Sequence, residues 1–334
     1  MNHPDYRPAQ RRQGRRLMHS IEAVNTFSFT ILAGNLITLL LLRLGANTTL
    51  IGILSAFPFM AFFFMPLAKG SVVKHGLVRT FGRAWTARYL VVIPIVFAPL
   101  MVNWNLQSLG VGLVMVSFFL FHAMRGFGLV SISPLYNEIS AGKDQGEFLS
   151  RKMMVVYGVS ILAGILVSLL LGPEAPLERY SLFMAVGIVL GFVGCATIFR
   201  VPEPPSAGFG VRTPFREDVR KGLADPAFRT FFVAIAFMFF TANLGRPFQI
   251  VYAKQVCHFG DDAAMVLTVV GNLGAIAMGW LCRMVLDRMG AKPMLVLFAV
   301  LAALGSLRLM LLAPSGGLTA WFALSAIFFV TTFG

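Results

Sequence analysis

Charged residues are scarce in this chain of 334 residues, because Asp, Glu, Lys and Arg together make up only 13% of it. Soluble globular proteins contain roughly a quarter charged residues, which they need to cover their surface. Hydrophobic residues make up 57% of the chain, and the mean hydropathy is +0.78. The lack of charge argues against an ordinary soluble fold and favours a chain that is dissolved in lipid.

Cysteine is also rare. Cys195, Cys257 and Cys282 lie far apart, form no CxxC pair and have no pair of histidines nearby in sequence. A lone cysteine in an apolar segment usually packs as a small core residue. We therefore predict no disulfide, no metal site and no cofactor.

Motifs that would signal a chemical activity are missing. No G-x-x-x-x-G-K-[ST] phosphate-binding loop occurs, so an ATPase that drives this protein would have to be a separate chain. Neither H-E-x-x-H nor G-x-S-x-G occurs, and His122 has no acid or nucleophile close to it in sequence. We expect that the protein is not an enzyme.

Acidic residues are half as frequent as basic ones, 14 against 28, which gives a net charge of +14. The basic residues lie in short segments between apolar runs, which indicates membrane topology rather than nucleic-acid binding. A membrane helix needs about 20 apolar residues to cross roughly 30 Å of hydrocarbon. We therefore predict an all-α, polytopic membrane protein with helices near 20–43, 49–69, 86–103, 108–130, 152–172, 180–199, 229–250, 263–283, 293–313 and 318–334.

The placement of lysine and arginine predicts the orientation, since cytoplasmic loops hold the excess of these residues. With the N-terminus in the cytoplasm, 22 of the 28 basic residues fall on the inner side. The inner loop after the second helix holds five of them: Lys69, Lys74, Arg79, Arg83 and Arg88. The exceptions are three residues on the outer side (Arg43, Arg179 and Lys254) and three within helices (Arg125, Arg246 and Arg308).

The chain divides into four parts. A basic cytoplasmic tail (1–19) precedes a six-helix bundle (20–199), a proline-rich cytoplasmic linker (200–228) and an incomplete second bundle of about four helices (229–334). Within the linker, Phe215, Val219 and Leu223 recur at helical spacing and suggest a short interfacial helix, although an unstructured linker fits the sequence as well.

A weak internal repeat relates the two bundles. Residues 40–54 and 255–269 share a layout in which an apolar run ends, the chain turns at Gly45 or Gly260, and another apolar run begins. Two helical bundles joined by a long inner loop imply a central site between them.

The loop after the eighth predicted helix reads Asp287-Arg288-Met289-Gly290-Ala291-Lys292. This stretch resembles the D-R-x-G-x-K core of a loop motif in the major facilitator superfamily of transporters. The resemblance implies two six-helix bundles and a gating role for Asp287, Arg288 and Gly290. Two features depart from the family. The equivalent first-half loop (69–83) has no acidic residue, and ten helices in place of twelve lead us to expect a chain shortened at its C-terminal end.

Arg125 is the first candidate for a transport site, because a charge within a membrane helix is costly and suggests function. It follows 17 residues without Lys, Arg, Asp or Glu, and His122 lies on the same helix face at i−3. His122 is therefore a candidate for proton coupling. The alternative is an arginine that reaches the inner interface or pairs with a helix carbonyl.

Arg246 lies late in the seventh helix, directly before Pro247, which removes a backbone donor and disturbs the preceding turn. Broken membrane helices are tolerated where the backbone lines a cavity. A substrate-binding patch and a structural kink with a snorkelling arginine both fit this segment. The predicted patch consists of Asn243, Arg246, Gln249 and Tyr252.

The first helix carries polar residues on one face, among them Asn25 and Asn35. These amides either line a pore, which the resemblance favours, or bond helices together. Glu22 at the inner end is a second candidate for proton coupling, although a solvated acid at a helix start is the commoner reason for such a residue.

These features together predict a secondary transporter that moves a small polar solute, with a proton or sodium ion as possible coupling partner. The arginines within helices favour a solute with an anionic group. A non-transporting sensor or scaffold, or the membrane subunit of a multi-chain transporter, is the alternative. We expect a monomer in the inner cell membrane that binds no nucleic acid.

Overall fold

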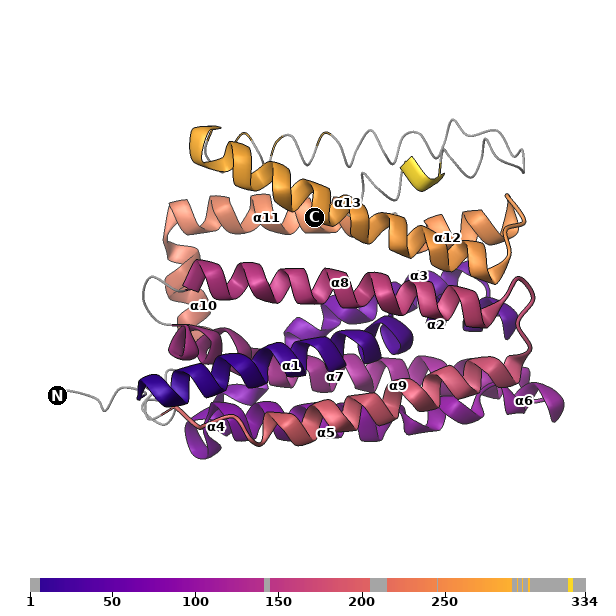
Figure 1. Cartoon of the computed structure of the whole chain (residues 1–334), viewed down its shortest axis with the longest axis horizontal. Coiled ribbons are helices and arrows are strands. Elements are labelled where there is room, and N and C mark those ends of the chain that lie inside the picture. The colour runs from indigo at the N-terminus through magenta and orange to yellow at the C-terminus, as the bar shows by residue number, and fades with distance from the viewer. Residues whose placement is uncertain are drawn as a thin grey trace.

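The computed structural model describes residues 7–140, 145–204, 215–244 and 246–289, together with 293, 296, 300 and 324–326. In this part of the chain the regular elements are helices, without strands. Six helical segments are long and apolar enough to cross a membrane, and they run side by side along the long axis of the molecule (Figure 1). Helices satisfy their own backbone groups, which hydrocarbon requires. The prediction of an all-α polytopic membrane protein is confirmed.

The first six predicted spans all form. The first three spans each consist of more than one element. The first is formed by α1 (Pro8–Ala33) and α2 (Asn35–Arg43), and the second by α3 (Thr48–Met60), η1 (Ala61–Phe64) and α4 (Met65–His75). The third is formed by α5 (Leu77–Val92), η2 (Ile93–Phe97) and α6 (Leu100–Asn103). The next three are the continuous helices α7 (Gln107–Ile139), α8 (Gln145–Leu171) and α9 (Leu177–Ile198).

Several helices begin earlier than the apolar runs that predicted them. The segment expected to be a tail is helical from Pro8, and the third span starts at Leu77 rather than near residue 86. Once a helix has nucleated, each added residue gains a backbone hydrogen bond, so polar turns extend it beyond the lipid. Hydropathy marks only the part of each helix that lies in hydrocarbon.

The remaining described helices are α10 (Phe215–Ala224), α11 (Pro226–Leu244), α12 (Arg246–Gln255) and α13 (Asp261–Met289). Of the two alternatives for the linker, the structure shows a helix at α10. The seventh predicted span is formed by α11 and α12, and the eighth lies within α13. The predicted ninth and tenth spans, with Arg308, fall almost entirely outside the described residues.

Close helix packing forms the core of the first six spans. An added Cβ at Gly191 of α9 would lie 2.1 Å from the ring of Tyr89 in α5, and one at Gly187 would lie 3.0 Å from Leu32 in α1. Small residues let membrane helices approach this closely. Large apolar side chains such as Phe63, Leu169 and Trp280 are exposed instead, as expected for surfaces that face lipid.

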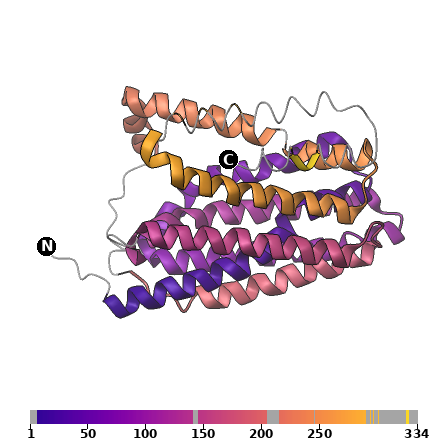
Figure 2. The same cartoon turned by 45° about the horizontal axis from the view of Figure 1, so that its top comes forward.

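The relation between α8 and α13 differs at the two ends of the molecule. We call the end that holds the N-terminus the inner end, following the arginine and lysine bias, and the opposite end the outer end. The two helices lie close together near the outer end and diverge toward the inner end in both views (Figures 1 and 2). The halves of the chain therefore meet at the outer end.

Candidate functional site

The first membrane span is interrupted by a break in its helix. It breaks at Gly34, between α1 and α2, where an added Cβ would lie 2.3 Å from the carbonyl oxygen of Thr30. In the seventh span, α11 ends at Leu244 and α12 begins at Arg246, with Pro247 as its second residue, and residue 245 lies outside the described residues. An interrupted membrane helix points to a transport site, because freed backbone groups there must face a cavity or protein.

Asn25 of α1 is the centre of a polar network with α5. Its side-chain oxygen Oδ1 accepts hydrogen bonds from Trp85 Nε1 at 3.0 Å, Arg88 Nη2 at 2.7 Å and Tyr89 Oη at 2.9 Å. Ser28 of α1 also turns away from the second half, since its hydroxyl donates to the carbonyl of Gly187 at 2.6 Å. The structure thus shows the helix-bonding alternative for the oxygen of Asn25.

Arg88 is a buried residue that the prediction from sequence placed in a loop. It was assigned to an inner loop, but its side chain is 0% exposed, and its guanidinium lies 4.5 Å from the ring centres of Trp85 and Phe121 and 4.6 Å from that of Tyr89. Cation–π contacts with several rings stabilise a desolvated guanidinium. The described residues provide it with no carboxylate partner, so its charge is compensated only by dipoles and aromatic rings.

A signal for Arg88 is present in the sequence. The buried face of α5 recurs at helical spacing and includes Val78, Phe81, Trp85 and Val92. Arg88 occupies a position on this same apolar face, seven residues after Phe81. Because the third span was expected to begin near residue 86, the face was cut short and the arginine was counted with the loop.

Arg125 and His122 of α7 lie next to this network. The guanidinium of Arg125 stands 5.6 Å from the ring centre of Phe29, and that of Arg88 stands 5.9 Å from the same ring. His122 is buried among phenylalanine rings, the closest being Phe118 at 4.5 Å between ring centres, and neither of its ring nitrogens has a hydrogen-bond partner. We call Asn25, Phe29, Arg88, Phe121, His122 and Arg125 the central cluster.

Glu22 lies near the middle of α1, outside the central cluster. The hydroxyl of Tyr136 in α7 donates to its carboxylate. Lys152 Nζ of α8 lies 3.8 Å from the same carboxylate oxygen and 4.5 Å from the centre of the Tyr136 ring. Glu22 is therefore a partnered carboxylate that connects three helices of the first half.

The other predicted binding residues lie on several elements. Asn35, the first residue of α2, donates through Nδ2 to Thr268 Oγ1 of α13 at 2.6 Å, so it joins the two halves of the chain. Gln249 in α12 is buried and Tyr252 is partly buried. Asn243 lies in the last turn of α11 and Arg246 begins α12, but their side chains lie outside the described part.

The predicted gating motif lies at the inner end. Asp287 and Arg288 fall in the last turn of α13, whereas their side chains and Gly290 lie outside the described residues. The equivalent first-half loop, which has no acid of its own, receives one from the linker. Glu203 accepts backbone hydrogen bonds from Val78 at 3.0 Å and Arg79 at 3.2 Å in the first turn of α5.

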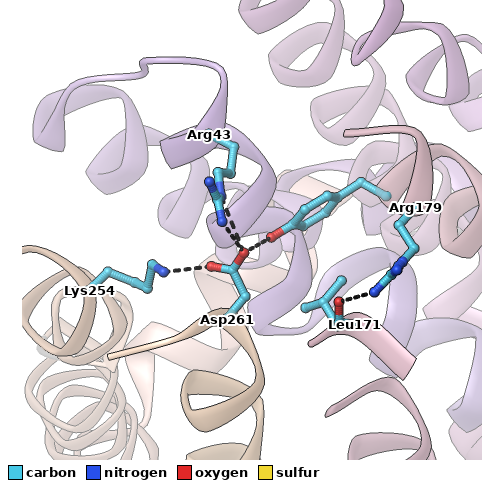
Figure 3. Close-up of polar contacts among 6 residues, drawn as sticks. Arg43, Leu171, Arg179, Lys254 and Asp261 are labelled. Atoms are coloured by element: carbon cyan, nitrogen blue, oxygen red, sulfur yellow. Dashed lines mark hydrogen bonds and ion pairs between the residues drawn. The ribbon is translucent and has the colours of Figure 1, made fainter. Parts of the chain in front are cut away.

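An ionic cluster joins the halves at the outer end. Arg43 Nη2 lies 2.8 Å from Asp261 Oδ2, Lys254 Nζ lies 2.7 Å from Asp261 Oδ1, and the hydroxyl of Tyr180 donates to Oδ2 at 3.0 Å. Figure 3 shows Arg43 and Lys254 reaching Asp261 from different elements. We call these four residues the outer cluster. The sequence identified both cations only as residues on the outer side and did not predict their partner.

Asp261 precedes the predicted eighth span (263–283) and is fully buried. Burial raises the pKa of its carboxyl group, but hydrogen bonds from Lys254 and Arg43 outweigh burial and hold that pKa below its usual value. The outer cluster is therefore ionic at neutral pH. A cavity of about 500 Å³ lies beside it, lined by Arg43, Lys254 and His258 among others.

An interrupted membrane helix, buried arginines without a described carboxylate partner and two halves that meet at one end are typical of a polytopic membrane protein of the transporter class. The family model of the Major Facilitator Superfamily matches residues 19–334. The chain belongs to this superfamily, and it is a transporter rather than an enzyme.

Solved structures support the same fold. The nucleoside transporter NupG matches with a TM-score of 0.61 at 17% identity, covering 97% of this chain and 79% of the other. A D-xylose–proton symporter matches with a TM-score of 0.65 at 14% identity, covering 96% and 79%. The xylose transporter XylE from E. coli, in a partially occluded inward open conformation, matches with a TM-score of 0.64 at 14% identity, covering 97% and 84%. The comparison with curated proteins finds no significant match.

Proposed function

We propose that this protein is a secondary active transporter that moves a small polar solute with an anionic group by alternating access. Membership of the superfamily and the interruption of the first span at Gly34 support this proposal. In it, the bundle formed by 20–199 and the bundle begun by 229–334 rock about a site near the middle of the membrane, with 200–228 as the connecting linker.

Arg125 carries the proposal. Its guanidinium lies within a membrane helix beside Phe29, and no described carboxylate pairs with it. A charged side chain at the centre of a membrane helix costs at least about 2.5 kcal/mol. Arg88 adds a second positive charge near the same ring. A solute anion that binds at Arg125 would compensate this charge, so the site favours anions over neutral solutes.

The remaining binding residues come from both halves. Asn35, at the break of the first span, and the predicted patch in the seventh span would contact the polar groups of the solute. That patch consists of Asn243, Arg246, Gln249 and Tyr252. The oxygen of Asn25 already accepts three hydrogen bonds from α5, so we assign Asn25 a positioning role, in which it holds Arg88 near Phe29.

For coupling to a proton, His122 is the stronger of the two candidates. Both of its ring nitrogens are buried without partners, whereas Glu22 is held by Tyr136 and Lys152. A proton on His122 would lie near Arg125 and Arg88, and an anion bound there would offset the repulsion between the three charges. Proton and anion would therefore bind together, as a symporter requires.

Uptake into proteoliposomes tests the proposal. Radiolabelled small carboxylates and phosphorylated solutes would be compared with a nucleoside and xylose, each with and without an inward proton gradient. We expect uptake of an anion that Arg125→Ala reduces to background, although the variant inserts normally. Arg151→Ala is the matched control, because Arg151 forms only an exposed pair with Glu147, and its uptake should equal that of wild type.

Three results would contradict parts of the proposal. Uptake of a neutral solute alone would show that the anionic group is wrong. Uptake that is the same in Arg125→Ala and wild type would remove Arg125 from the site. No uptake of any solute by well-inserted wild type would favour the sensor or scaffold.

A further inference from the structure

The outer cluster joins the two halves through one buried carboxylate. Asp261 begins α13 in the second half, whereas Arg43 ends α2 and Tyr180 lies in the first turn of α9, both in the first half. Both Nε and Nη2 of Arg43 donate to Asp261 Oδ2, at 3.2 and 2.8 Å, and Tyr180 donates to the same oxygen. A single oxygen atom thus receives three hydrogen bonds from the opposite half (Figure 3).

The backbone around Asp261 strengthens the same contact. The amide of Asp261 donates to the carbonyl of Pro173, in the connection between α8 and α9, at 3.0 Å. Ser168 of α8 donates to the carbonyl of Asp262 at 2.9 Å. Side chain and backbone at the start of α13 are therefore both fixed to the first half.

The described polar contacts between α13 and the first six spans lie near the start of α13. In the part of α13 whose side chains are described, they involve Asp261, Asp262 and Thr268. Further along, α13 diverges from α8 toward the inner end (Figures 1 and 2). In this conformation the described contacts join the halves at the outer end.

Separation of the halves would change the surroundings of Asp261 more than those of its cations. Lys254 lies in α12, in the same half as Asp261, and would remain its partner. Arg43 and Tyr180 would leave, and the buried carboxylate would lose the donors that compensate its burial. Arg43 is partly exposed in the closed state, so water can solvate it when it leaves.

We propose that the outer cluster is the latch that keeps the outer end closed, with Asp261 as its central residue. Opening to the outside requires that Asp261 part from Arg43 and Tyr180. This role rests on the proposed alternating access, and it places a gate at the end opposite to the predicted gating motif of Asp287, Arg288 and Gly290.

Accessibility of a buried reporter cysteine tests the latch without any solute. Ala264 is fully buried one turn into α13, so Ala264→Cys in a background without Cys195, Cys257 and Cys282 reports on opening. A membrane-impermeant maleimide is added outside right-side-out vesicles that hold the full chain. We expect Asp261→Asn to raise the labelling rate on the order of tenfold or more, because its partners lose their buried counter-charge.

Matched variants separate a latch from a general loss of structure. Asp262→Asn removes the neighbouring acid, which contributes only its backbone carbonyl to the contact, and should label like wild type. Tyr180→Phe removes one hydrogen bond from the first half and should give an intermediate rate. Arg43→Gln should label fast, and Arg43→Lys should label more slowly than Arg43→Gln. If Asp261→Asn does not fold, the labelling rates of Tyr180→Phe and of the two Arg43 variants test the latch instead.

Equal labelling of the folded latch variants and Asp262→Asn would overturn the latch. The labelling needs no transported solute, so it can fail or succeed independently of uptake. Faster labelling of the latch variants, combined with no uptake by wild type, would support the latch and contradict the transport function. Normal uptake by wild type, combined with unchanged labelling of the latch variants, would support the transport function and contradict the latch.

Discussion

The partners of a buried arginine in a membrane protein indicate whether its role is structural or ligand binding. Arg88 is buried against three aromatic rings and bonded to Asn25 and Tyr89, whereas Arg125 has Phe29 and no described acid. Arg88 is held by several partners, although its Nε is buried without one, whereas Arg125 has fewer contacts. This difference supports the positioning role proposed for Arg88 and the binding role proposed for Arg125, and residue type alone could not have shown it.

The fixed geometry around Arg88 predicts that lysine cannot replace it. A planar guanidinium stacks on rings and donates from several nitrogens, and an ammonium does neither in the same way. We expect Arg88→Lys to lower the free energy of unfolding by about 1–3 kcal/mol, the usual cost of unsatisfied buried polar groups. Thermal unfolding in detergent measures this, with the exposed Arg83→Lys of the same helix as control. Equal melting temperatures of the two variants would contradict the proposed positioning role.

Gly191 gives a second prediction for a single residue. An added Cβ would lie 2.1 Å from the Tyr89 ring, and hydrogen bonds to Asn25 and Ser28 hold that ring in place. Overpacking of this kind typically costs about 1–3 kcal/mol. We therefore expect Gly191→Ala to lower the melting temperature measurably. Gly158→Ala in α8, where the added atom meets nothing within 4 Å, should leave it unchanged or slightly raised.

At the scale of elements, the start of α5 depends on the linker. Glu203 accepts hydrogen bonds from two amides in the first turn, close to the positive end of the helix dipole. Gly76 has a positive φ of 92°, and an added Cβ there would lie 2.5 Å from Glu203 Oε1. The linker thus supplies the carboxylate that the first-half loop lacks.

Removal of this charge should loosen the inner end of α5. Loss of a capping side chain costs about 1 kcal/mol, so we expect Glu203→Gln to increase hydrogen exchange at the amides of Val78 and Arg79. Glu217→Gln is the control, because Glu217 pairs only with Lys221 on the surface of α10. Unchanged exchange at the start of α5 would show that the neutral amide caps the helix equally well.

At the scale of the whole molecule, successive spans run in opposite directions, so the connections between them lie alternately at the inner and the outer end. Lys74 lies near the end of α4 at the inner end, and Glu174 lies between α8 and α9 at the outer end. In intact cells, a membrane-impermeant maleimide should label Glu174→Cys and not Lys74→Cys, both in the cysteine-free background. Permeabilised cells should label both positions. The reverse pattern would invert the orientation derived from lysine and arginine.

Much of the fold could be predicted because hydrophobicity is a local property of each segment. The first six spans appeared at the predicted places. Helix ends were less certain, since Leu77 and Pro8 begin helices within polar sequence. The error at Arg88 arose from such an end, because a residue assigned to a loop was never considered as a buried one.

The candidate site was predictable in part. Arg125 and His122 were identified because an isolated polar residue in an apolar helix is visible in the sequence itself. The hydrogen bonds that Asn25 accepts from α5, and the contacts of Glu22 with Tyr136 and Lys152, depend on which helices pack against each other. Such contacts join residues up to 130 positions apart, as for Glu22 and Lys152, and no periodicity in one segment encodes them.

The sequence by itself determined that this chain lies in the membrane, which end faces the cytoplasm in our prediction, and which charges lie within its helices. Composition and the spacing of apolar runs suffice for this, because the hydrophobicity of each helix by itself determines whether that helix enters lipid. Only the tertiary structure decided that Arg88 is buried against aromatic rings, that Arg125 has no described carboxylate partner, and that Asp261 is bonded to both halves of the chain. The energy of a buried charge depends on the partners around it, and packing of distant segments selects those partners.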